Sequence, residues 1–334
     1  MTRRALIVSD ARPSHTGATS WRRFCMLTEV LRGFGLGVDA IVVRSGDETP
    51  ADTRALLGEV GDLQIVASGD LDWWIGRAMR RRDYQSVVLT SPALGQHAAH
   101  SAKLRIVDMQ SPGGSFDQDS GADLILTGDK KSADLAAEMG CNVLEAPFFG
   151  AGVRKQRPAL KKQRPLAGCW VEQSHEAVEA VRRLFSKIEE RGGGGCPNFA
   201  LAGPGAGAVH PPRLPFPVSL MPPDTDERVF YRGLDLAMVP CLEEGAPRLD
   251  VVSALEHGAT PLASSAALGG LRRRWRLPHF GRLDQMADFL FERGGEMRDG
   301  GLLVELRARA DWTWSGLVTA AARTRVKLGR QLMT

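Results

Sequence analysis

A basic side chain at a predicted strand-to-helix junction is the clearest candidate for chemistry. The apolar run Leu236–Pro240 predicts a buried strand, the loop Glu243–Pro247 follows it, and a helix begins near Arg248. Free backbone N–H groups and the helix dipole favour an anion at such a junction. Arg248 would add a charge-assisted hydrogen bond to a phosphate. Because its side chain would face a cleft and not the core, Arg248→Ala should have little effect on folding. On the loop alone, a plain turn beside a solvated arginine is the simpler interpretation.

Two glycines follow another predicted strand, Phe199–Ala202. Gly203 and Gly205 stand in the segment GPGAGA, where a nucleotide-binding loop would lie. A lone GxG is a weak signal, and the third glycine of a dinucleotide fingerprint is missing, so no Rossmann cofactor is expected. Gly203 would either contact a bound nucleotide or serve only as part of a plain turn, and both interpretations remain open.

The N-terminal half holds three further candidate residues. Gly17 lies in the loop after the strand Ala5–Val8 and would permit close backbone approach to phosphates. His15, in the same loop, would add a polar contact or simply be exposed. Asp108 follows the strand Leu104–Val107, where a carboxylate could orient or deprotonate an acceptor hydroxyl. Capping of the next loop is an equal alternative for Asp108.

Metal-binding patterns are incomplete, so we expect no metal and no bound cofactor. His97 and His100 form an HxxH pair without an evident third ligand. Asp70 and Asp72 form a DxD sequence, but it precedes a helix, where one of them would serve as an N-cap.

Strands and helices alternate along the whole chain, which predicts parallel, doubly wound α/β sheets. The segment from Gly150 to Pro165 is basic and aperiodic, and predicts a linker. The expected organisation is an N-terminal domain over residues 1–150, a linker over 151–165, a second domain over 166–310 and a C-terminal helix over 311–334.

Composition narrows the class of protein. The 334 residues carry a net charge of +4, which fits an anionic substrate or membrane face and falls short of a nucleic-acid binder. The five cysteines have no CxxC spacing, and no apolar run is long enough for a signal peptide or a spanning helix. We expect a cytoplasmic protein, with Trp73, Trp74 and the cluster Arg77–Arg82 as a surface for peripheral contact with the inner face of a membrane, or else as a solvated helix face.

The segment Tyr231–Leu271, YRGLDLAMVPCLEEGAPRLDVVSALEHGATPLASSAALGGL, resembles the nucleotide-binding domain of the group 1 glycosyltransferases. The resemblance is strongest over about residues 166–320. It implies a GT-B fold, with two doubly wound Rossmann-like domains facing a central cleft, and metal-independent transfer of a sugar with retention of configuration. It also implies that residues 1–150 bind the acceptor, that residues 166–310 bind the nucleotide sugar, and that the C-terminal helix packs back toward the first domain. The residues that it places at the donor are Gly17, Gly203, Glu244, Gly245, Arg248, Ser253 and Glu256.

The sequence departs from the family pattern at two places. Ser253 stands where the family carries a glutamate, with Glu256 nearly one turn later, and GCWVEQSH lacks the basic pair that binds the diphosphate. Either Arg248 carries the phosphate alone, or the donor is unusual, or catalysis is lost. The expected partners are a nucleoside-diphosphate sugar and a glycan, lipid-linked or protein acceptor. A non-catalytic binding or assembly protein and a sugar-nucleotide epimerase are the alternatives.

Overall fold

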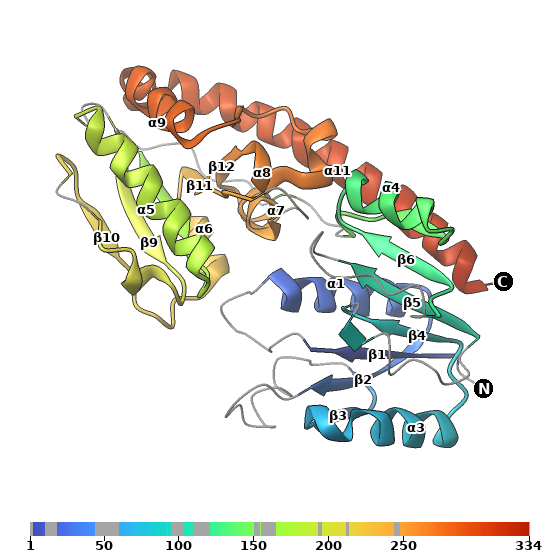
Figure 1. Ribbon diagram of the computed structural model, residues 1–334. Helices are drawn as coiled ribbons and strands as arrows, with labels where there is room; N and C mark the ends of the chain where they lie inside the picture. The colour runs from blue at the N-terminus through green and yellow to red at the C-terminus, as the bar shows by residue number, and fades with distance from the viewer. Residues whose placement is uncertain are drawn as a thin grey trace. The chain divides into compact units, whose positions relative to one another are not determined.

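Two parallel β-sheets form the framework of this protein in a computed structural model (Figure 1). The structure describes residues 3–10, 19–43, 60–91, 93–94, 103–109, 121–149, 154, 165–192, 196–211, 214–243 and 248–333. Unit 1 comprises residues 1–151 and 320–334, and unit 2 comprises residues 152–319. The helix α11 (Gly301–Met333) contributes its first part to unit 2 and its last part to unit 1. The sequence-based boundary at 310/311 therefore falls inside one continuous helix.

Unit 1 is built on a sheet of seven parallel strands. In spatial order these are β3 (Leu63–Val66), β2 (Gly37–Val43), β1 (Arg4–Ser9), β4 (Ser86–Leu89), β5 (Leu104–Met109), β6 (Leu124–Thr127) and β7 (Val143–Glu145). The central strands read as continuous apolar runs because both of their faces are covered.

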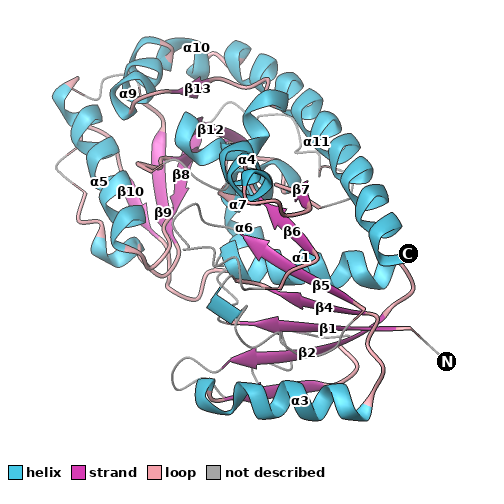
Figure 2. Ribbon diagram, turned by 45° about the vertical axis from the view of Figure 1, so that its right-hand side comes forward, coloured by secondary structure: helices cyan, strands magenta, loops and turns pink. Residues whose placement is uncertain are grey.

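Helices pack on both faces of this sheet, as a doubly wound fold requires (Figure 2). Ala5 and Ile7 of β1 point toward α1 (Thr19–Gly33) and the end of α11, which contribute Phe24 and Leu328 to the same core. The alternate residues of β1 pack on the other face, toward α3 (Leu71–Arg81) and α4 (Lys130–Glu138).

Unit 2 is built on a sheet of six parallel strands. In spatial order these are β10 (Val218–Leu220), β9 (Asn198–Ala202), β8 (Leu166–Trp170), β11 (Leu236–Val239), β12 (Thr260–Ser264) and β13 (His279–Phe280). The helices are α5 (His175–Glu190), α6 (Glu227–Gly233), α7 (Leu249–Glu256), α8 (Ser265–Leu268), α9 (Leu283–Glu292), α10 (Gly294–Arg298) and the first part of α11. The predicted fold class, α/β with two doubly wound sheets, is confirmed.

An arginine from the predicted linker is part of unit 2. The Arg154 side chain is buried, and its guanidinium donates to the carbonyl oxygens of Leu255, Gly258 and Ala259 at 3.0–3.3 Å. It also forms an ion pair with Asp311 of α11. Cations stabilise a helix C-terminus, so Arg154 holds the end of α7 against α11.

Candidate donor site

The strand order of unit 2 reverses direction between β8 and β11, which pair in parallel. In open α/β sheets, ligands bind beyond the carboxyl ends of strands at such a switch point. The segments that leave these two strands carry Glu172 and Arg248, and they bring both side chains to the switch point.

Arg248 is the N-cap residue of α7, one position before the helix. Its backbone N–H donates to the Ala267 carbonyl at 2.8 Å, which fixes the start of α7 beside α8. Guanidinium Nη2 lies 2.9 Å from Asp250 Oδ2 and 3.3 Å from Glu172 Oε2. Only 14% of the Arg248 side chain is exposed, and its Nε is buried without a hydrogen-bond partner among the described residues.

The electrostatic surroundings of Arg248 differ from those expected. Burial acts to lower its pKa, but the carboxylates of Asp250 and Glu172 outweigh burial and raise it, so the guanidinium is firmly charged. Asp250 is itself only 2% exposed in its side chain. Removing Arg248 would therefore leave a buried carboxylate without its cation, which is costly. The expectation that Arg248→Ala would hardly affect folding is revised accordingly.

Cys241 closes the other side of this junction, directly after β11. Its backbone N–H donates to the buried Ser264 hydroxyl at 2.9 Å, and its Sγ contacts Glu176 Oε1 at 3.2 Å. Burial and the hydrogen bond to Glu176 raise the pKa of the Cys241 thiol to about 11. The thiol is therefore neutral at physiological pH and acts as a structural donor to the Glu176 carboxylate.

Gly203 and Gly205 let the turn after β9 pack tightly on the segment after β8. Gly203 has φ +97°, and a Cβ there would lie 2.6 Å from the Val171 carbonyl oxygen. A Cβ on Gly205 would lie 2.2 Å from the Glu172 carbonyl oxygen. This packing explains both glycines as the close approach of two backbones, and a donor contact by Gly203 stays a prediction.

Ser253 and Glu256 occupy different positions along α7 from Arg248. Ser253 is half-buried in the middle of the helix, and its carbonyl accepts from the His257 N–H at 3.0 Å. Glu256 is the last residue of α7, about 12 Å along the axis from Arg248 at the usual helical rise. The helix runs back from the carboxyl edge of the sheet, so it does not bring Glu256 to Arg248.

The segment after β8 lacks a basic residue, as the sequence shows, and it places the carboxylate of Glu172 beside Arg248. Glu172, Glu176, Cys241 and Asp250 are the described residues of this site that were not among those predicted from the sequence. The sequence does contain a signal for the pair between Asp250 and Arg248. Among the described residues in the first turn of α7, Asp250 is the one with a carboxylate that can reach Arg248.

Asp108 lies at the carboxyl edge of the other sheet, inside β5, and is completely buried. Both of its oxygens accept from Arg23 of α1, each at 2.9 Å, and the Arg23 guanidinium also stacks 4.3 Å from the Phe149 ring centroid. This bidentate pair occupies the carboxylate that would otherwise orient an acceptor hydroxyl. A role for Asp108 as a base stays a prediction.

A polar cluster lies at the switch point of this sheet, where β1 and β4 end. The Ser91 hydroxyl donates to Asp10 Oδ2 at 2.7 Å, and the Thr90 hydroxyl donates to Ser9 Oγ at 2.9 Å. The sequence signal for this cluster is a polar residue directly after each apolar strand. The remaining candidates, His15, Gly17, Glu244 and Gly245, lie outside the described residues.

The described residues contain no group of three or more His, Cys, Asp or Glu side chains that could hold a metal ion. His97 and His100 are outside that part of the chain. Among the helices of the described ranges, none has the length and apolar character needed to cross a membrane.

Comparison with known proteins finds similarity in structure only. No protein-family model and no curated protein sequence matches the chain. Sucrose-phosphate synthase from Thermosynechococcus elongatus superposes with a TM-score of 0.68 at 13% identity, covering 99% of each chain. HepE from Anabaena, solved in complex with UDP and glucose, gives 0.64 at 11% identity, over 99% of this chain and 98% of that one.

A trehalose-phosphate synthase (UDP-forming) from Burkholderia vietnamiensis also superposes, with a TM-score of 0.64 at 11% identity, over 100% of this chain and 97% of that one. Identities this low establish the fold and not the reaction. Two parallel Rossmann-like sheets that match such structures over the full chain identify the fold of this protein as GT-B, the fold of the nucleotide-sugar glycosyltransferases.

Proposed function

We propose that this protein transfers a sugar from a nucleoside-diphosphate donor to an acceptor hydroxyl, without a metal. The observation that carries the proposal is the position of Arg248, a charged and mostly buried arginine at the switch point of unit 2 and at the start of α7. Leaving-group charge would be stabilised there by the guanidinium and the helix N-terminus. The structural relatives support a donor of this class, since HepE was solved with UDP-glucose.

The deciding experiment is calorimetric titration of UDP and UDP-glucose into Arg248 variants. Arg248→Lys keeps a charge beside the buried Asp250 but loses the planar fork, so it separates binding from folding. A hydrogen bond to a charged group is worth roughly 1.5–3 kcal/mol, so Arg248→Ala should weaken UDP binding about 10- to 100-fold. Arg248→Lys should recover part of that loss.

Arg183→Ala is the matched control, because Arg183 is an exposed arginine of α5 paired with Glu179 in the same unit. It should bind UDP as the parent does. If Arg248→Lys and Arg248→Ala both bind UDP with parental affinity, Arg248 is not the phosphate ligand. Thermal unfolding of each free variant shows how much of any loss comes from instability.

The pairing of Arg248 with two carboxylates favours one second candidate, a non-catalytic GT-B protein that binds a ligand other than a diphosphate. Glu172 and Asp250 offset the single cation, so a diphosphate meets a site without excess positive charge. Binding of UDP-glucose accompanied by its slow hydrolysis would support the transferase. Failure of UDP, GDP and ADP sugars to raise the melting temperature would support the second candidate.

We also propose that α3 of unit 1 makes a peripheral contact with an anionic membrane. Trp73 is 53% exposed, and the Arg77 guanidinium lies 5.0 and 5.2 Å from the ring centroids of Trp73 and Trp74. Arg80 and Arg81 are exposed on the same helix. Basic and aromatic side chains on one helix face suit the interface of an anionic membrane. Co-sedimentation with phosphatidylglycerol vesicles, reduced in Trp73→Ala, would support this contact.

A further inference from the structure

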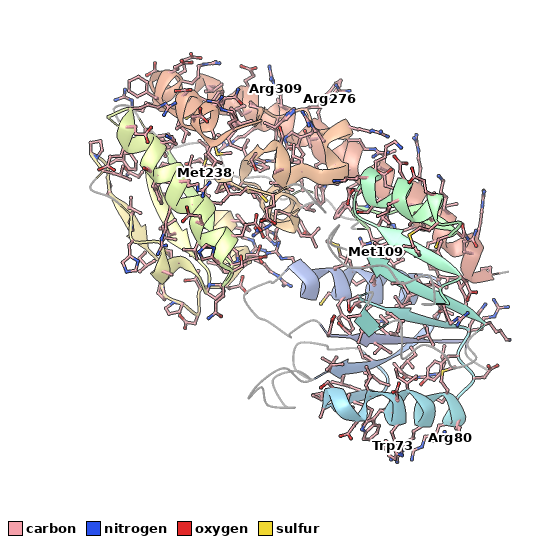
Figure 3. All side chains as sticks on the ribbon, viewed as in Figure 1. Trp73, Arg80, Met109, Met238, Arg276 and Arg309 are labelled. Carbon is pink, nitrogen blue, oxygen red and sulfur yellow. The ribbon has the colours of Figure 1, made fainter. Side chains whose placement is uncertain are left out.

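A cavity of about 380 Å³ opens beside the first part of α11, and its lining is unlike that of the donor site. Its walls are Arg276, Ala308, Arg309 and Trp312, all of them in unit 2. Figure 3 labels the two arginines next to one another beside α11. The volume lies at the lower end of the range of about 300–1,000 Å³ for ligand pockets.

The fold builds this cavity from helical spacing and one buried hydroxyl. Ala308 and Trp312 stand four residues apart on α11, so the small side chain leaves open space beside the indole. The buried Thr313 hydroxyl accepts from the Arg276 N–H at 3.2 Å and donates to the Arg309 carbonyl at 2.8 Å. One residue therefore fixes the backbone of both arginines.

The cavity is positively charged. Arg276 is exposed, and so are Arg272, Arg273 and Arg274 just before it. Of the acidic groups on this stretch of α11, Glu305 pairs with Arg309, and Asp311 pairs with the buried Arg154. The local excess of guanidinium groups selects an anionic ligand.

The ligand must also use Trp312, whose side chain is 76% exposed at the edge of the cavity. An indole offers a wide apolar face, and a guanidinium offers a planar fork that matches a carboxylate. Free phosphate would engage the arginines and leave the indole unused. The indole shares this hollow with Arg276 and Arg309, and that arrangement suits one ligand with a ring and a carboxylate better than a flat membrane surface.

We propose that this cavity binds an acidic saccharide residue, with the sugar ring against Trp312 and its carboxylate between Arg276 and Arg309. The site lies apart from Arg248 and does not depend on the proposed transfer reaction. It would hold an acidic glycan to the protein whether or not a nucleotide sugar is bound.

The test is calorimetric titration of tetragalacturonate into the full-length protein without nucleotide, with maltotetraose as the neutral ligand of the same length. We expect tetragalacturonate to bind and maltotetraose to bind at least about ten-fold more weakly, because an ionic hydrogen bond contributes at least that factor. Trp312→Ala and Arg276→Ala should each weaken binding by a similar factor. Ala308→Leu should do the same by filling the cavity while every charge is kept.

Trp73→Ala and Arg80→Ala are matched controls, since they remove an exposed tryptophan and an exposed arginine from α3 (Figure 3). They should bind tetragalacturonate as the parent does. The proposal is overturned if the cavity variants bind like the parent, if tetragalacturonate does not bind at millimolar concentration, or if inorganic phosphate or UDP binds this cavity more tightly.

Two further outcomes would reassign the surface. Loss of tetragalacturonate binding in Arg248→Lys with full binding in Trp312→Ala would place the saccharide at the donor site instead. Binding to phosphatidylglycerol vesicles that Trp312→Ala abolishes and Trp73→Ala does not would make the cavity a membrane contact. Failure of UDP, GDP and ADP sugars to bind, with these results otherwise as expected, would refute only the transferase proposal.

Discussion

The Nη2 atom of Arg248 lies 3.3 Å from Oε2 of Glu172, so the candidate phosphate ligand already has an anionic partner from the neighbouring strand end. A second partner, Asp250, is nearly fully buried, whereas the Glu172 side chain is 22% exposed. Glu172 is therefore the carboxylate that a donor phosphate can displace. In the proposed function, the donor and Glu172 compete for the same guanidinium.

Removing that competition should strengthen nucleotide binding. Partly exposed ion pairs contribute about 0.2–1 kcal/mol, so Glu172→Gln should tighten UDP binding by roughly 1.4- to 5-fold. Calorimetry measures the change, with Glu179→Gln on α5 as the control for loss of one carboxylate. Weaker binding in Glu172→Gln would show that Glu172 contacts the donor and does not compete with it.

The buried pair between Arg23 and Asp108 leads to a prediction about stability. Their side chains are 1% and 0% exposed, so Asp108→Asn leaves an uncompensated guanidinium in the core of unit 1. Breaking a buried pair in this way costs about 3–5 kcal/mol, which a urea titration would record as a lower midpoint. The double variant Arg23→Met/Asp108→Leu should recover much of that loss, because no lone charge remains. An Asp108→Asn protein of parental stability that lacks transferase activity would instead support the catalytic role.

Much of the fold could be predicted from the sequence, because buried parallel strands read as apolar runs. The strands predicted at Ala5–Val8, Leu104–Val107, Phe199–Ala202 and Leu236–Pro240 are present as β1, β5, β9 and β11. The two residues of β13, His279 and Phe280, are too few to show a pattern.

The site was harder to predict, because side-chain partners come from packing and not from spacing. The loop chemistry placed Arg248 correctly at a helix start, but its partner Glu172 comes from another strand. Asp108 was expected in an open cleft, and packing of α1 on the sheet instead gives it Arg23. The direction of α7 carries Glu256 away from Arg248, which a local reading of the motif did not take into account.

A pair of glycines in one turn offers a test of close backbone packing. Gly205→Ala would place a Cβ 2.2 Å from the Glu172 carbonyl oxygen, so the two segments must separate. We expect a loss of about 1–3 kcal/mol in unfolding free energy, as for other overpacked sites.

Gly207→Ala is the matched control in the same turn, since a Cβ there meets nothing within 4 Å. It should change the urea midpoint little, or raise it slightly through a less flexible unfolded chain. Equal midpoints for the two variants would mean that the backbones adjust freely, and that Gly205 is not needed for their approach.

The lowered pKa of the Asp39 carboxyl predicts how the stability of unit 1 depends on pH. Burial acts to raise the pKa of this carboxyl, but hydrogen bonds from Arg4, Arg82 and Tyr84 outweigh burial and lower it. The folded state therefore binds the proton more weakly than the unfolded chain. The stabilisation by Asp39 is complete above its unfolded pKa of about 4 and is lost as the pH falls through the lowered folded value.

Asp39→Asn should accordingly lower stability at pH 7 by about 1.5–3 kcal/mol, because two partly exposed arginines lose their hydrogen bonds to a buried anion. The difference between parent and variant should shrink as the pH falls below about 4, where the parent carboxyl also becomes neutral. Urea midpoints of both proteins between neutral and strongly acidic pH measure this convergence. Asp134→Asn is the control, since its ion pair with Lys130 is exposed and should leave the pH profile unchanged. Parallel profiles for the parent and Asp39→Asn would show that the Asp39 pKa is not lowered in the folded state.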